Sequence, residues 1–121
     1  MTEQNKDYGR LAHILTYCEK IRAAAEVFQG DRATFLSDAN YQTRDVCCFY
    51  ILQIGELSRG LSDSFKELHS NIPWKQIRGM RNVVVHKYGD IDLDTLWDVL
   101  MHDIPKLHDA CKKIYETNAG N

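Results

Sequence analysis

Three residues in the second half of the chain have side chains suited to chemistry on a phosphodiester: Arg81, His86 and Tyr88, in the pattern Arg-x4-His-x-Tyr. A guanidinium donates forked hydrogen bonds to phosphate oxygens and stabilises the negative charge of a pentacoordinate transition state. A neutral imidazole removes the proton of a ribose 2′-OH, and an imidazolium gives one to the departing 5′ oxygen. The pattern therefore indicates Arg81 and His86 as candidate catalytic residues for RNA cleavage without a metal ion.

The segment around these residues is basic, although the whole chain is not. The sequence has 15 lysines and arginines against 17 aspartates and glutamates, a formal net charge of −2. Residues 71–88 nevertheless contain no acidic residue, and they include Lys75, Arg78 and Lys87 as well as the arginine of the motif. A local excess of positive charge predicts a phosphate-bearing partner. Lys75, Arg78 and Lys87 are therefore candidate RNA contacts, and Asn82 can hydrogen-bond the phosphate or orient a histidine.

These residues also have structural interpretations. An imidazole near a helix end interacts favourably with the helix dipole, and a tyrosine is common at the edge of a core. Spacing alone therefore leaves catalysis and a structural role open for His86 and Tyr88. Surface or core-edge positions are expected for the histidines that lack a comparable basic or polar neighbourhood: His13, His69, His102 and His108.

Helices are expected to position the candidate residues. Apolar residues recur at intervals of three and four, no strand-like alternation is found, and Gly30 and Gly89 follow two of the expected helices. Pro105 lies inside the last pattern and is expected to kink that helix. The expected main helices are residues 7–29, 39–61, 73 to 87 or 88, and 93–115, with short helical turns at 31–38 and 64–68. The sequence therefore predicts an all-α, up-down helical bundle.

Two features of these helices predict a homodimer. The helix expected at residues 39–61 is apolar around most of its circumference, which requires burial on more than one side. On an ideal helix, Arg81 and Tyr88 are about 20° apart, but His86 is about 140° from Arg81. A second copy of the chain would cover the apolar helix and would bring a second set of these side chains toward the first. Glu56, in the apolar helix, is either a surface residue or an inward acid paired with one of the basic groups.

Composition and cysteine usage limit the class of protein. The 121 residues are 44% hydrophobic and 26% charged, which is typical of one globular domain covering residues 1–121. No apolar run approaches the roughly 20 residues of a membrane span, and the polar amino terminus is unlike a signal peptide. A cytoplasmic protein without membrane association is expected. The four cysteines form no CxxC pair, so buried thiols are predicted, with no metal site and no cofactor.

Several segments together resemble the HepT family of HEPN-superfamily toxins, formerly the DUF86 family of unknown function. The segments are Ile51–Leu57, Ile72–Pro73–Trp74, Gly79–Tyr88, Leu96–Trp97 and Asp103–Leu107, in the family's order over nearly the whole chain. The resemblance implies a four- or five-helix HEPN bundle, homodimeric, with a ribonuclease site between the subunits. It also implies that Arg81 and His86 are the catalytic pair.

The same resemblance implies a partner. HepT toxins of type VII toxin-antitoxin systems are neutralised by a nucleotidyltransferase antitoxin of the MNT type, which transfers AMP from ATP onto the tyrosine of the motif, here Tyr88. An adenylyl group on this residue adds bulk and negative charge beside Arg81, where an RNA phosphate is expected. The alternative function is a non-catalytic HEPN partner that binds a nucleotidyltransferase, nucleotide or RNA without cleaving it.

Overall fold

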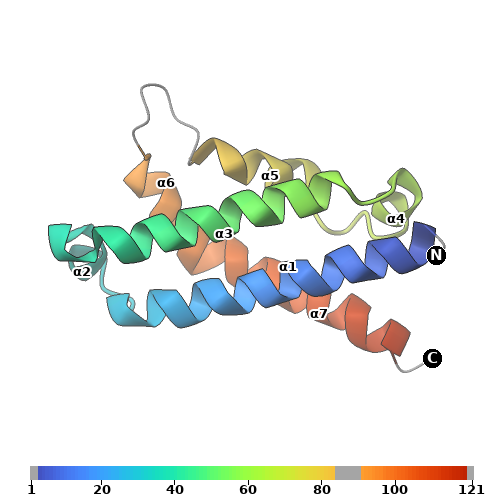
Figure 1. Cartoon of the computed structure of the whole chain (residues 1–121), viewed down its shortest axis with the longest axis horizontal. Coiled ribbons are helices and arrows are strands. Elements are labelled where there is room, and N and C mark those ends of the chain that lie inside the picture. The colour runs from blue at the N-terminus through green and yellow to red at the C-terminus, as the bar shows by residue number, and fades with distance from the viewer. Residues whose placement is uncertain (1–2, 84–90, 120–121) are drawn as a thin grey trace.

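The computed structural model describes residues 3–83 and 91–119, and within these ranges every regular element is helical. The α-helices are α1 (Glu3–Ala25), α2 (Arg32–Leu36), α3 (Tyr41–Arg59), α4 (Asp63–Leu68), α5 (Trp74–Gly79), α6 (Leu93–Asp98) and α7 (Ile104–Ala119). The chain reverses direction from α1 to α3, from α3 to α5, and again in α7 (Figure 1). The predicted all-α bundle is therefore confirmed.

The core lies where α1 packs against α3 and α7. On α1, the side chains of Leu11, Ile14, Cys18 and Ile21 follow one another at spacings of three and four, and none is more than 1% exposed. The facing helices contribute equally buried stripes: Cys47, Ile51 and Ile54 from α3, and Ile104, Leu107 and Cys111 from α7. Full burial of a side chain of this size contributes about 1.5–3 kcal/mol. The helical periodicity of the sequence thus fixes which face of each helix is inside.

Short segments close the end of the bundle where α1 meets α2. A 3₁₀ turn, Glu26–Phe28, extends α1, and Gly30 then adopts a φ of 68°, which favours glycine. Asp31 caps α2: its carboxylate accepts hydrogen bonds from the Thr34 hydroxyl and N–H at 2.6 and 3.3 Å. The Thr34 hydrogen bond lowers the pKa of Asp31. Gly30 thus follows the helical segment, as the sequence predicts, and Asp31 caps the next one.

An aromatic cluster fills the space beneath this cap. The rings of Phe28 and Phe35 lie edge to face with centroids 5.1 Å apart, and Trp97 of α6 lies 5.0 Å from Phe35. The buried guanidinium of Arg44 donates hydrogen bonds to the carbonyl oxygens of Phe35 and Ser37 at 2.5 and 2.8 Å. Arg44 therefore satisfies backbone acceptors that α2 leaves without helical partners.

The final helix contains a wide turn immediately before its proline. Residues Val99–Asp103 form a π-helical turn between α6 and α7, and the Ile104 N–H bonds to the Val99 carbonyl five residues earlier. Pro105 has no N–H, and in a regular α-helix its ring meets the carbonyl four residues before it. The wide turn relieves that contact. The irregularity expected at Pro105 is therefore present, on the amino-terminal side of the proline.

The four cysteines are buried and form no disulfide, as the sequence predicts. Burial raises the pKa of Cys48 to about 11 and those of Cys47 and Cys111 to about 12, and it also raises the pKa of Cys18. No helix within residues 3–83 and 91–119 has both the length and the hydropathy that crossing a membrane requires.

Candidate functional site

Helices α3 and α5 lie side by side (Figure 1), and α3, α5 and the 3₁₀ turn Met80–Val83 carry the charged groups of the candidate site. They come close at Gly55, where a methyl group would lie 3.6 Å from the Arg81 Cβ and 3.7 Å from the Arg78 carbonyl oxygen. A larger side chain at position 55 would therefore separate the two helices. The glycine in the middle of α3 keeps Arg81 close to the residue that follows it, Glu56.

The inner side of α5 is fixed by burial. Pro73 directly precedes the first helical residue, Trp74, whose indole N–H donates to the His69 carbonyl at 3.1 Å. Trp74 and Ile77 are buried, whereas Lys75 is exposed. The same helix therefore anchors itself in the core and presents its cations to solvent.

The sequence predicts one α-helix from residue 73 to 87 or 88, and the structure differs from this prediction. α5 ends at Gly79, and Met80–Val83 form a 3₁₀ turn. Glycine is a poor residue for a helix interior, and 3₁₀ turns are frequent at helix ends. The angles expected between Arg81 and the later motif residues assume a regular α-helix, so they do not apply. His86, Lys87 and Tyr88 lie outside the described residues.

Arg81 forms an ion pair with Glu56. The Arg81 Nη1 and Glu56 Oε1 atoms are 3.5 Å apart, and the two side chains are 40% and 58% exposed. Both interpretations of Glu56 therefore hold in part, because the residue is on the surface and is also paired with a basic group of the motif. An exposed pair of this kind contributes about 0–1 kcal/mol and exchanges readily with solvent or another anion.

Three further predicted contacts, Lys75, Arg78 and Asn82, line a shallow groove next to this pair. The groove has a volume of about 320 Å³ and is lined by Lys75, Arg78, Gly79, Arg81 and Asn82. Three of its five residues are cations. A concave surface with one sign of charge concentrates ligands of the opposite sign. The structure thus brings together Lys75, Arg78, Arg81 and Asn82 on one concave, positively charged surface, which we call the cationic groove.

One histidine that the sequence assigns to the surface or core edge is buried among polar groups. The His108 side chain lies between α1 and α7, with Nε2 3.5 Å from Glu19 and Nδ1 3.3 Å from Asp109 and 3.5 Å from Arg22. The expectation that His108 has no polar neighbourhood is therefore wrong. Glu19 and Arg22 lie one turn apart on α1, but the sequence does not show which face of α7 meets them.

Over the described part of the chain, no group of three or more histidine, cysteine, aspartate or glutamate side chains lies close enough together to hold a metal ion. The aspartates after residue 90 have separate roles. Asp92 accepts the Thr95 N–H at 3.1 Å and caps α6, and Asp94 forms an ion pair with Arg32.

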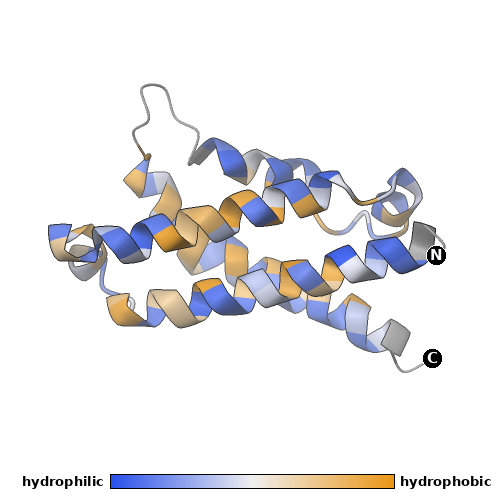
Figure 2. Cartoon of the chain, viewed as in Figure 1, coloured by the Kyte–Doolittle hydropathy of each residue, from blue (hydrophilic) through white to orange (hydrophobic). Residues whose placement is uncertain are grey.

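A further surface of α3 is apolar and uncovered. Val46 and Phe49 are 42% and 53% exposed, unlike the buried apolar residues of the same helix. Figure 2 shows hydrophobic residues along the side of α3 that faces the viewer. Phe49 and Glu56 are seven residues apart, which is two helical turns, so they share one face. The exposed Val46 and Phe49 therefore lie on the face of α3 that also carries Glu56, together with polar residues such as Asp45 and Gln53.

Comparison with known proteins identifies related sequences. The profile described as "Ribonuclease HepT-like" matches residues 14–114. The chain is 44% identical over 54 residues to "Putative RNase MJ1380" of Methanocaldococcus jannaschii, covering 45% of this chain and 50% of that protein. It is 38% identical over 61 residues to "Probable ribonuclease HepT" of Thermococcus cleftensis, covering 50% and 56%.

A longer match is found to "Gamma-glutamylcyclotransferase and putative RNase MJ0434" of Methanocaldococcus jannaschii, with 34% identity over 109 residues, 88% of this chain and 46% of that protein. The chain thus spans about half the length of the curated relatives it matches. No solved structure matches it significantly. Because the profile covers all but the two ends of the sequence, the chain belongs to the ribonuclease HepT-like family.

Proposed function

We propose that the protein is a metal-independent endoribonuclease and the toxin of a type VII HEPN/MNT toxin-antitoxin system. The observation that carries the proposal is the cationic groove, which holds the arginine of an Arg-x4-His-x-Tyr motif in a chain of the HepT-like family. Lys75, Arg78 and Asn82 have exposed positions from which they can hold RNA phosphates, and Lys87 is proposed to extend this set. The relatives named as ribonucleases support the same reaction.

The proposed reaction is an in-line transfer within the RNA. His86 removes the proton of the ribose 2′-OH, and the 2′ oxygen attacks the adjacent phosphorus atom while the bond to the 5′ oxygen breaks. An imidazolium protonates the departing 5′ oxygen. The Arg81 guanidinium leaves Glu56 and stabilises the dianionic transition state. The products are a 2′,3′-cyclic phosphate and a 5′-hydroxyl, so every proton is transferred between RNA and protein.

A homodimer would place one His86 on each side of the phosphodiester and divide the base and acid roles between the two copies. The exposed apolar face of α3 supports this proposal, because Phe49 and Val46 are large hydrophobic side chains that water covers in one subunit alone. A second copy on that face would end next to Glu56 and Arg81. The groove would then lie at the edge of the dimer interface.

Neutralisation is proposed to act through Tyr88, with AMP transferred to its hydroxyl from ATP by an MNT-type nucleotidyltransferase. Bond formation between the tyrosine oxygen and the α-phosphorus releases pyrophosphate. The attached group carries a phosphodiester negative charge, which is attracted by Lys75, Arg78 and Arg81. It would therefore occupy the groove in place of an RNA phosphate. The intact mass of the wild-type protein should rise by one or more AMP units, and that of Tyr88→Phe should not.

Cleavage of RNA by the purified protein tests the central proposal. We expect products ending in a cyclic phosphate and a 5′-hydroxyl, with rates unchanged by a chelator. His86→Ala should abolish cleavage, whereas His102→Ala, which changes an exposed histidine outside the groove, should not. A folded His86→Ala protein with full activity would refute the mechanism. A wild-type protein that binds RNA but never cuts it would favour the non-catalytic alternative.

A further inference from the structure

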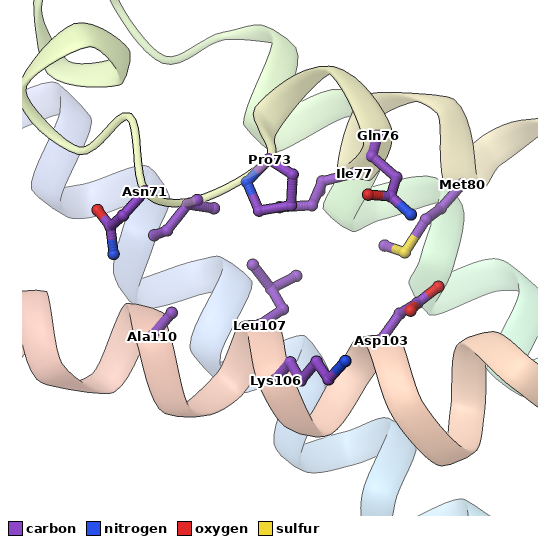
Figure 3. A pocket seen from close by; sticks show the side chains of 10 residues that line it. Asn71, Pro73, Gln76, Ile77, Met80, Asp103, Lys106, Leu107 and Ala110 are labelled. Carbon is purple, nitrogen blue, oxygen red and sulfur yellow. The ribbon is translucent and has the colours of Figure 1, made fainter.

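A second cavity lies on the other side of α5, between this helix and α7. It has a volume of about 350 Å³, near the lower limit of typical ligand sites. Its apolar lining includes Ile77 and Met80 from the α5 side and Leu107 from α7 (Figure 3). Figure 3 shows Leu107 pointing from α7 toward Ile77 across the cavity. The cavity is thus large enough for a ring system and has an apolar part between α5 and α7.

Three polar side chains line this cavity. Figure 3 shows the amide of Gln76 and the carboxylate of Asp103 beside the Met80 side chain, and the ammonium of Lys106 on α7 below Leu107. With other residues of the described ranges, these three side chains make no hydrogen bond or ion pair. Asp103 is also the last residue of the π-helical turn, and such turns are frequent at functional sites. The cavity therefore has both donors and acceptors available to a ligand.

We propose that this cavity binds a guanine base of the RNA substrate, an inference that rests on the proposed ribonuclease function. A carboxylate accepts hydrogen bonds from the N1–H and N2–H groups of guanine, and an ammonium donates to its O6 and N7 atoms. Asp103, at the end of the π-helical turn, and Lys106, in the first turn of α7, supply this pair. Met80 and Leu107 provide apolar and thioether contacts to the faces of the ring. Single-stranded bases are commonly read in this way, by stacking together with hydrogen bonds to their edges.

The charges of the two sites favour the base in the cavity and the phosphate in the groove. The Asp103 carboxylate would repel a phosphate in the cavity, whereas the cationic groove is lined by three cations and no acid. The two sites share the end of α5, because Gln76 and Met80 line the cavity and Gly79 and Arg81 line the groove. A nucleotide at this end of α5 would place its base in the cavity and its phosphate in the groove.

Nucleosides without phosphate test the cavity independently of the groove. We expect guanosine to shift the methyl NMR signals of Met80 and Leu107 in the full chain carrying His86→Ala, with roughly tenfold weaker binding of adenosine. Asp103→Asn should reduce guanosine affinity roughly tenfold. Asp98→Asn, which changes an exposed aspartate of α6 outside the cavity, should leave it unchanged. Ala110→Leu should fill the cavity and abolish binding of both nucleosides.

Equal binding of guanosine and adenosine, no binding of either, or an unchanged guanosine affinity in Asp103→Asn would each overturn the proposal. Cleavage is a separate measurement, made with oligonucleotides that contain or lack a single guanine. Cleavage without guanine preference and without guanosine binding would remove the base site and leave the ribonuclease function. Asp103-dependent guanosine binding by a wild-type protein that cuts no RNA would retain the base site and remove the ribonuclease function.

Discussion

Replacing Glu56 by glutamine should strengthen RNA binding while changing stability little. The pair distance is 3.5 Å, and both partners are exposed, with 40% and 58% of their side-chain surfaces accessible. Two unit charges about 4 Å apart interact by about 1 kcal/mol in water, and measured surface pairs contribute about 0–1 kcal/mol. The free energy of unfolding should therefore fall by less than about 1 kcal/mol. In the wild-type protein, an RNA phosphate must displace Glu56 from Arg81 and lose about this much energy. In Glu56→Gln that cost is absent.

The expected gain in affinity is up to about fivefold, since about 1.4 kcal/mol corresponds to a factor of ten. Fluorescence anisotropy with a labelled single-stranded RNA would measure it, in protein that also carries His86→Ala so that the RNA is not cut. If Arg81 gains a phosphate contact, the salt dependence should steepen by about 0.7 in the slope of log K against log salt. Glu67→Gln, an exposed change on α4, is the matched control and should alter neither quantity.

One result would refute this reasoning directly. Weaker RNA binding by Glu56→Gln, with the fold and stability retained, would mean that Glu56 holds Arg81 in its binding position rather than competing with the phosphate. Glu56 would then be a positioning residue, and Arg81 would need the acid to reach RNA. The slope of log K against log salt changes when the number of phosphate contacts changes, and it does not change when net charge is altered away from the RNA. The slope therefore distinguishes these two causes of altered binding.

Phe49→Asp should convert the proposed dimer to a monomer without unfolding it, because Phe49 is half exposed in one subunit. Sedimentation would test this, with Tyr115→Asp, which changes an exposed aromatic residue of α7, as the control. Gly55→Ala should leave the fold intact and raise stability by up to about 1 kcal/mol, because the added methyl group lies at ordinary contact distance from Arg81 and alanine is the better helix former. A fall in the urea midpoint would contradict this. Stability should also decline as pH rises above 9.0, the ordinary cysteine pKa, because the unfolded thiols ionise there while burial keeps the four native thiols protonated. Denaturation curves between pH 8 and 10 would check the sign, and thiol reagents at pH 8 should label the cysteines only after unfolding.

The fold was largely predictable from the sequence because its helices have long amphipathic patterns. Leu11, Ile14 and Cys18 are spaced for one helical face, and the structure buries that face. The chain between Pro73 and residue 83 was less predictable. Local spacing does not distinguish one long α-helix from α5 followed by a 3₁₀ turn, since the difference is decided by Gly79 and by packing against α3.

The candidate site could be predicted only in part. The cations of residues 75–81 are close in sequence, on α5 and the 3₁₀ turn that follows it, so their shared groove follows from local sequence. The pairing of Arg81 with Glu56 joins residues 25 positions apart and depends on the close approach at Gly55. The cavity between α5 and α7 depends on how these two helices are placed, which no local pattern in either segment specifies.

The wide turn at Val99–Asp103 sets the rotation of α6 relative to α7 about their common axis. Without this turn the two segments would form one continuous helix. Upstream of the turn, Trp97 rests against Phe35 in the aromatic cluster, and downstream Leu107 faces the cavity beside α5. If Pro105 were replaced, these residues would be able to form a regular α-helix. The α6 segment would then be rotated about the helix axis relative to α7. Either the contact of Trp97 with Phe35 or the position of Leu107 beside α5 would then be lost. Pro105 therefore links the packing of the aromatic cluster to the shape of the cavity beside α5.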